Sequence, residues 1–206
     1  MIIRKMQAKI KRFRARKNPP IQLPFPVSPA LRMAQLSAGP KFAGVQPVML
    51  KRFQNLRSFS PNVVAGTASE LQRLAELASL GSLDTSSIDH ALVVITFYGG
   101  KPMTDVVRVI LWQAFGVPIF ELYLGLDNGL LCLECEAHEG WHLAPGVAFA
   151  LLDGEMILSG GGNNGLRTGL AAVLDANPCP CGRTPSRLLD VVQMNRPDAR
   201  CLAASA

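Results

Sequence analysis

Residues 91–97, Ala-Leu-Val-Val-Ile-Thr-Phe, form an almost unbroken apolar run. Such a run fits a strand that is buried on both faces, as strands of parallel sheets usually are. Gly99 and Gly100 then turn the chain, and Thr104 begins a helical apolar stripe that ends at Gly116. A second apolar stretch covers 117–124. The order strand, helix, strand predicts a parallel βαβ unit.

The pattern continues on both sides of this unit. Upstream, we expect a short strand over 61–66 and a helix from Thr67 to about Leu80. Downstream, short strands over 130–135, 147–152, 155–159 and 188–192 lie between Gly, Asn and Pro turns. The predicted fold class is therefore α/β, with a small β-rich module after the parallel unit. The expected divisions are a basic helix (1–18), a Pro-rich extended arm (19–44), an α/β part (45–128), a β-rich zinc module (129–193) and a tail (194–206).

Charge is unevenly distributed along the chain. The formal net charge is +6, but residues 1–69 contain 13 Lys or Arg and no acid, while residues 70–206 contain 8 basic and 15 acidic side chains. A basic segment joined to an acidic body indicates that the basic segment binds a negatively charged surface. We expect a protein partner or larger assembly, and the same charge leaves nucleic acid or an anionic membrane surface open.

The first 18 residues favour a basic amphipathic helix. Ile2, Ile3, Met6, Ile10 and Phe13 repeat at helical spacing and form one stripe. The rest of the helix surface carries the cations of the expected partner-binding arm: Arg4, Lys5, Lys9, Lys11, Arg12, Arg14, Arg16 and Lys17. Six prolines between 19 and 40 predict an extended arm without regular structure.

Composition narrows the class of protein. Apolar residues make up 49% of the chain and charged residues 17%, which is typical of a globular protein. No apolar run reaches the roughly 18 residues of a membrane span. The N-terminus lacks the apolar core of a secretory signal, so we expect an intracellular, cytoplasmic protein, with organelle import through the basic segment as the alternative.

The cysteines predict a structural zinc site. Cys179 and Cys181 form a tight Cys-Pro-Cys-Gly knuckle, and Cys135 and His138 are a second closely spaced pair near a strand end. Three thiolates and one imidazole complete a tetrahedral zinc site that has no position for water. We therefore expect Cys135, His138, Cys179 and Cys181 as the ligands.

Other ligand sets stay open at this stage. His142 could replace His138, and Cys132 could pair with Cys135 as Cys-x-x-Cys. In an extended strand, however, residues three apart point to opposite faces. Cys132 also stands between Leu131 and Leu133, where a small thiol packs well. A set of thiols without any metal is the remaining alternative.

Several motifs occur in an order that resembles phenylacetate–coenzyme A ligases and related adenylate-forming enzymes. They begin with Asn-Val-Val-Ala-Gly-Thr-Ala-Ser-Glu-Leu from Asn62, and continue with Gly-Gly-Lys-Pro-Met-Thr from Gly99 and Phe-Gly-Val-Pro from Phe115. Glu-Cys-Glu-Ala-His-Glu-Gly from Glu134, Arg-Thr-Gly from Arg167 and Cys-Pro-Cys-Gly-Arg-Thr from Cys179 follow. The resemblance covers residues 52–190 or so. It implies ATP-dependent activation of a carboxylate, transfer to coenzyme A, and the same four zinc ligands.

The departures from the family pattern lie at its nucleotide-binding positions. Leu170 follows Arg-Thr-Gly where the family has the acid that holds ribose, and Lys101 replaces the Glu of the adenine loop. The family's phosphate loop has no counterpart upstream, and the Gly-rich stretch over 160–168 has Leu166 where a phosphate loop requires Lys. The domain that carries the family's catalytic lysine lies beyond the last match. These departures predict no adenylation and no ATP or AMP cofactor.

The expected function is a non-catalytic scaffold with a structural zinc that binds a partner through its basic arm. The alternatives are a carboxylate–CoA ligase subunit completed by another chain, and a nucleic-acid-binding protein. The ligase alternative needs a ligand pocket. Its expected residues are Tyr98, Gly99, Gly100, Lys101, Tyr123 and Arg167.

Overall fold

The computed structural model describes residues 18–160, 163–183 and 187–194. The eight cations of the expected arm, Arg4, Lys5, Lys9, Lys11, Arg12, Arg14, Arg16 and Lys17, lie outside the described residues. The tail from 195 onward lies outside them too. Among the described residues, no helix is long and apolar enough to cross a bilayer.

A nine-stranded sheet forms the centre of the molecule, in the order β11-β12-β7-β6-β5-β4-β3-β1-β2. Strands β5, β4, β3, β1 and β2 are parallel to one another, and β6, β7, β12 and β11 continue the sheet from β5 with antiparallel pairing. The strands are β1 (Met33–Gln35), β2 (Val48–Met49), β3 (Val63–Gly66), β4 (Ala91–Phe97), β5 (Ile119–Leu124), β6 (Leu130–Glu134), β7 (Trp141–Leu143), β11 (Leu170–Asp175) and β12 (Arg187–Gln193).

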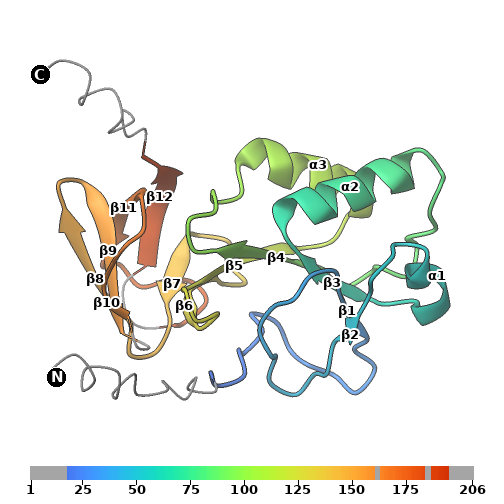
Figure 1. Ribbon diagram of the computed structural model, residues 1–206, viewed down its shortest axis with the longest axis horizontal. Coiled ribbons are helices and arrows are strands. Elements are labelled where there is room, and N and C mark those ends of the chain that lie inside the picture. The colour runs from blue at the N-terminus through green and yellow to red at the C-terminus, as the bar shows by residue number, and fades with distance from the viewer. Residues whose placement is uncertain (1–17, 161–162, 184–186, 195–206) are drawn as a thin grey trace, which may run out of the picture.

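A second, antiparallel sheet of three strands lies beside the antiparallel end of the first (Figure 1). It consists of β8 (Ala148–Leu152), β9 (Glu155–Gly160) and β10 (Asn163–Arg167). The expected β-rich half is thus present, but most of its strands extend the parallel sheet instead of forming a separate module. The sequence does not predict β7, β10 or β11, because β7 has only three residues, Asn and Gly interrupt β10, and alanine favours strands less than β-branched residues do in β11.

The helices are α1 (Asn55–Phe59), α2 (Ala68–Ser79) and α3 (Asp105–Phe115). Figure 1 shows α2 and α3 on the same face of the parallel strands. Thr67 and Glu70 form a reciprocal capping box at the start of α2, and Thr104 caps α3. Gly116 ends α3 with a left-handed φ of 66°, which glycine adopts without strain. The predicted βαβ unit, with its strands, helices and caps, is confirmed.

The Pro-rich segment is not the extended arm that the prolines suggest. Ile21, Leu23 and Phe42 are at most 6% exposed, and β1 is paired inside the large sheet between β2 and β3. In Figure 1 this blue segment covers the face of the sheet opposite to α2 and α3. Prolines prevent regular structure, but the apolar residues between them still gain free energy by burial against the sheet. The globular part therefore begins well before Val45.

Candidate metal centre

Three thiols and one imidazole come together at one end of the antiparallel strands. The ligand atoms of Cys135, His142, Cys179 and Cys181 all lie within 4.8 Å of one another. Cys135 follows β6, His142 lies in β7, and the other two cysteines lie in the loop between β11 and β12. The first three are buried and Cys181 is partly exposed. The fold thus brings together donors that are up to 46 positions apart in sequence.

Two of the distances between these atoms are close to those of a tetrahedral zinc site. The sulfurs of Cys135 and Cys179 are 3.6 Å apart, and the Cys181 sulfur is 3.4 Å from His142 Nε2. Zinc bonds to sulfur and nitrogen place two sulfurs about 3.8 Å apart and a sulfur and a nitrogen about 3.6 Å apart. A disulfide requires about 2.05 Å between sulfurs, so the thiols are too far apart for one. The group could hold a metal ion, and its donors are those that zinc prefers.

Two turns of the same shape present the thiols. The N–H of His138 donates to the Cys135 carbonyl at 3.0 Å, and the N–H of Gly182 donates to the Cys179 carbonyl at 2.9 Å. His138 and Gly182 both have a left-handed φ, 53° and 73° respectively. Each turn curls its backbone around the cysteine that opens it, which is the geometry of a metal-binding knuckle.

Each thiol also accepts a hydrogen bond from the backbone N–H two residues later. The N–H of Arg183 lies 3.4 Å from the Cys181 sulfur. The corresponding donors are Ala137 for Cys135 and Cys181 for Cys179. Such hydrogen bonds stabilise negative charge on sulfur, which a metal-bound thiolate carries. The second coordination shell of a thiolate site is therefore already built.

The thiols differ in how readily they ionise. Burial raises the pKa of Cys135 to about 12. Burial also opposes ionisation of Cys179, but the N–H of Cys181, the neighbouring thiols and the Arg187 guanidinium outweigh it and lower the pKa of Cys179. Since zinc binds the thiolate form, Cys179 is better prepared to bind than Cys135.

The structure corrects the choice of histidine. His142 lies beside the three thiols, whereas the His138 ring stacks on Phe120 with 4.8 Å between ring centroids. His138 Nδ1 lies 3.3 Å from Glu134 Oε1. His138 occupies the left-handed corner of its knuckle, the position that Gly182 holds in the other one, and a side chain there points away from the thiols. Close spacing to Cys135 suggested His138, but His142 reaches the site because β7 pairs with β6 and β12.

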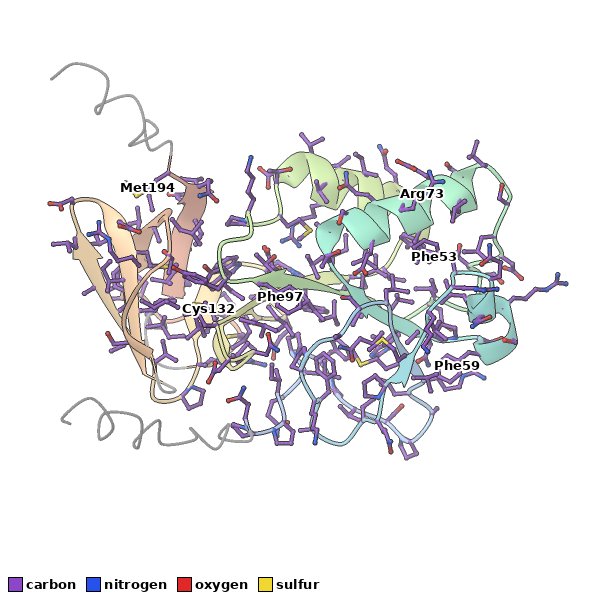
Figure 2. The ribbon with its side chains drawn as sticks, in the orientation of Figure 1. Phe53, Phe59, Arg73, Phe97, Cys132 and Met194 are labelled. Atoms are coloured by element: carbon purple, nitrogen blue, oxygen red, sulfur yellow. The ribbon has the colours of Figure 1, made fainter. Side chains whose placement is uncertain are left out.

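Cys132 is a core residue, as its apolar neighbours in sequence indicate. It is fully buried in the hydrophobic cluster where the large sheet meets the second sheet (Figure 2), together with Trp141 and Leu170. Burial raises its pKa well above the usual thiol value. It is not part of the metal-binding group formed by the described residues.

The expected nucleotide pocket is only partly assembled. Tyr98 and Arg167 do meet, because the Tyr98 hydroxyl donates to the Arg167 carbonyl at 3.0 Å. The Arg167 guanidinium is held by Glu155, which is 1% exposed, with Nε 2.6 Å from Oε2. Tyr123 is fully buried and stacks on Trp141, and burial raises its pKa to about 12.

The remaining residues of that set lie in the turn after β4. Gly99 has a left-handed φ of 79°, and the N–H of Gly100 donates to the Phe97 carbonyl at 2.8 Å. Lys101 lines a hollow of about 760 Å³ between the start of α3 and β12. Glu121 of β5 lines the same hollow and is 2% exposed. Sequence reasoning missed Glu121, since a lone acid in an apolar strand shows no motif.

None of the known protein-family profiles matches the chain, and no curated protein matches its sequence. Solved structures do resemble it. A 2-hydroxyisobutyryl-CoA ligase with 2-HIB-AMP and CoA, in an open conformation, aligns with a TM-score of 0.61 at 16% identity over 79% of this chain and 44% of the ligase. The same ligase in its thioesterification state aligns with a TM-score of 0.61 at 15% identity over 81% and 44%.

A mutant coronafacic acid ligase from Pectobacterium brasiliense aligns with a TM-score of 0.50 at 14% identity over 69% of this chain and 33% of the ligase. At such identities the likeness concerns the fold. The chain shares its fold with part of each of these ligases, and it spans less than half of their length.

Proposed function

We propose that the chain is a non-catalytic relative of phenylacetate–coenzyme A ligases, held together by a structural zinc ion, which binds a partner protein through its basic N-terminal segment. The observation that carries the proposal is the closed Cys135, His142, Cys179 and Cys181 group. Its four protein donors fill the tetrahedral positions of zinc and leave none for water or substrate. Zinc bound here would supply structure, not chemistry.

The position of the site supports a structural role. The donors come from the end of β6, from β7 and from the β11–β12 loop, so one ion would tie together three segments of the antiparallel region. The described part of the loop between β11 and β12, residues 176–183, contains no helix that could hold it in place. Binding energy at such a site contributes directly to folding.

Two residues at the family's ribose-binding motif support the absence of adenylation. Leu170 replaces the acid and is fully buried in the core beside Cys132 and Trp141. Arg167, the first residue of the motif, is engaged by Glu155. A buried leucine offers no acceptor to a ribose hydroxyl, and phosphoryl chemistry depends on such positioning groups and on charge neutralisation.

The basic segment supports a protein partner with an acidic surface. Residues 1–69, which include this segment, contain 13 of the chain's 21 Lys and Arg and no acid, and residues 70–206 have more acids than bases. Electrostatic attraction of this kind sets the rate and orientation of association more than its strength. The segment's apolar stripe would supply the contact area that charge alone does not.

A ligase subunit is the second candidate, and one observation favours it. Lys101 comes from the turn that matches the family's adenine loop, and it lines the same hollow as the buried Glu121. A nucleotide base could enter a hollow of about 760 Å³. In this alternative, another chain supplies the phosphate-binding groups.

Metal analysis tests the first proposal. Elemental mass spectrometry on the wild type, Cys179→Ser and Cys132→Ser should give about one zinc per chain for the first and third proteins and none for the second. Both substitutions replace a buried thiol by a hydroxyl, so Cys132→Ser controls for the loss of a thiol as such. Zinc that persists in Cys179→Ser, or is absent from the wild type, would refute the zinc site.

Thermal melting of the same samples with MgATP separates the two candidates. The non-catalytic scaffold predicts no shift of the melting temperature at millimolar MgATP. A shift that disappears in Glu121→Gln would favour the ligase subunit and would refute the proposed absence of nucleotide chemistry, whatever the zinc content.

A further inference from the structure

An apolar groove lies next to the candidate metal centre, at the point where the described chain begins. It has a volume of about 690 Å³. Residues 18–22 line it, together with Leu130, Leu143, Ala144 and Val147. His142 and Gly182 also line it, so the groove borders the candidate metal centre. In Figure 1 the dark-blue start of the described chain lies below β6 and β7.

The walls of this groove contain apolar side chains that the fold does not cover completely. Leu130, Leu143 and Val147 are only partly buried, although each packs on a hydrophobic cluster. A solvated apolar groove gains about 25 cal/mol for each Å² of apolar surface that an occupant covers. The charged side chains in its lining are Asp127 and Arg183, so apolar contact determines what fits.

The preceding segment of the same chain starts at the rim of the groove. Asn18 lines the groove, and its Nδ2 donates to the Asp127 carbonyl at 2.6 Å, which fixes the point where residues 1–17 leave. Phe13 is five residues away, so it lies within about 18 Å of Asn18 in any conformation. Tethering of this kind gives an effective concentration in the millimolar range. Weak apolar contact is then sufficient for binding.

The sequence of this segment fits such an occupant. Ile2, Ile3, Met6, Ile10 and Phe13 repeat at the spacing of one helix face. An amphipathic helix of this kind binds by placing its apolar face in a hydrophobic groove. Its cations lie on the other faces, and the acidic excess of residues 70–206 attracts them to the body at long range.

We infer that residues 2–13 bind as a helix in the groove formed by residues 18–22, Leu130, Leu143 and Val147, with their apolar stripe inward and their cations outward. A docked helix would present its cations to the acidic partner on a fixed surface, and this consequence rests on the proposed function. Docking within the chain itself does not require a partner or nucleotide.

Methyl NMR on the full chain tests the docking without any partner. The variants are Ile10→Asp, on the stripe, and Ala8→Asp, on the opposite face of the same predicted helix. Both add one carboxylate to the same segment. We expect Ile10→Asp to shift the methyl resonances of Leu130, Leu143 and Val147, and to speed amide hydrogen exchange in residues 2–13 at least tenfold. Ala8→Asp should leave both close to wild type.

Equal effects of the two substitutions, or none at the groove methyls, would overturn the inference. A matching substitution on the groove side, Val147→Asp, should also speed amide hydrogen exchange in residues 2–13. Because these measurements use the protein alone, a negative result would exclude docking of residues 2–13 in the groove without excluding binding of a partner. Partner binding can likewise fail while the groove methyls respond as expected.

Discussion

His138 and Gly182 occupy equivalent positions in two matching turns. Each stands three residues after a cysteine of the candidate metal centre, each donates its N–H to that cysteine's carbonyl, and each has a left-handed φ. Glycine adopts this conformation freely, whereas a histidine there is strained. The Phe120 ring and the Glu134 carboxylate hold the histidine in place.

We therefore expect alanine substitution of His142 and of His138 to affect zinc binding differently. His142→Ala removes a donor and should reduce zinc affinity more than a hundredfold, because loss of a ligand costs more than loss of a group that only orients one. His138→Ala removes the ring stacking on Phe120 and should keep about one zinc per chain. Competition with a chromophoric chelator measures both affinities. A parallel loss of zinc in both variants would contradict the ligand set.

The sequence predicts the parallel part of the fold well, since runs such as 91–97 and caps such as Thr67 and Thr104 act locally. The three thiols of the candidate metal centre could be identified for the same reason. The histidine could not, because proximity in sequence favoured His138, while the pairing of β7 with β6 and β12 decides in favour of His142. The Pro-rich segment resembles a free arm in the sequence because its burial depends on packing against β3, β4 and β5, which lie later in the chain.

Glu121 predicts an unusual dependence of stability on pH. Burial raises its pKa to about 7, and repulsion from Glu134 adds to this effect, while hydrogen bonds from Thr96 and Met103 oppose it. The folded state therefore binds this proton more tightly than the unfolded state. The contribution of Glu121 to the free energy of unfolding is greatest below a pH of about 4.5, falls as the pH rises, and is lowest above about 7. The two limits differ by about 3 kcal/mol.

Glu121→Gln should remove this dependence. Glutamine can still accept the hydrogen bonds from the Thr96 hydroxyl and the Met103 N–H. We expect the variant to be more stable than the wild type at pH 8 and to lose that advantage as the pH falls toward 5, as measured by urea unfolding across this range. Glu76→Gln, which removes an exposed acid, should follow the wild type. A constant difference between Glu121→Gln and wild type would show that Glu121 does not titrate in this range.

Restoring the family's acid should damage the fold and not create a nucleotide site. Leu170→Asp places a carboxylate in the fully buried cluster around Cys132 and Trp141. An unpaired buried charge should lower the free energy of unfolding by about 3 kcal/mol or more. Leu170→Asn, of similar size but uncharged, should cost less. Unfolding curves with and without MgATP make the comparison, and stabilisation of Leu170→Asp by MgATP would instead indicate a latent ribose site.

The basic segment predicts how binding to polyanions depends on salt. If its cations contact phosphates, the logarithm of the binding constant should fall with the logarithm of salt concentration by about 0.9 for each phosphate neutralised. A protein partner that also contacts the apolar stripe should lose less affinity in salt. Fluorescence anisotropy with a DNA duplex and with polyglutamate, between low and physiological salt, compares the two probes. Replacing Arg12, Arg14 and Arg16 by Gln should weaken both. A steep slope for DNA together with tighter binding than polyglutamate at physiological salt would favour a nucleic-acid partner over an acidic protein.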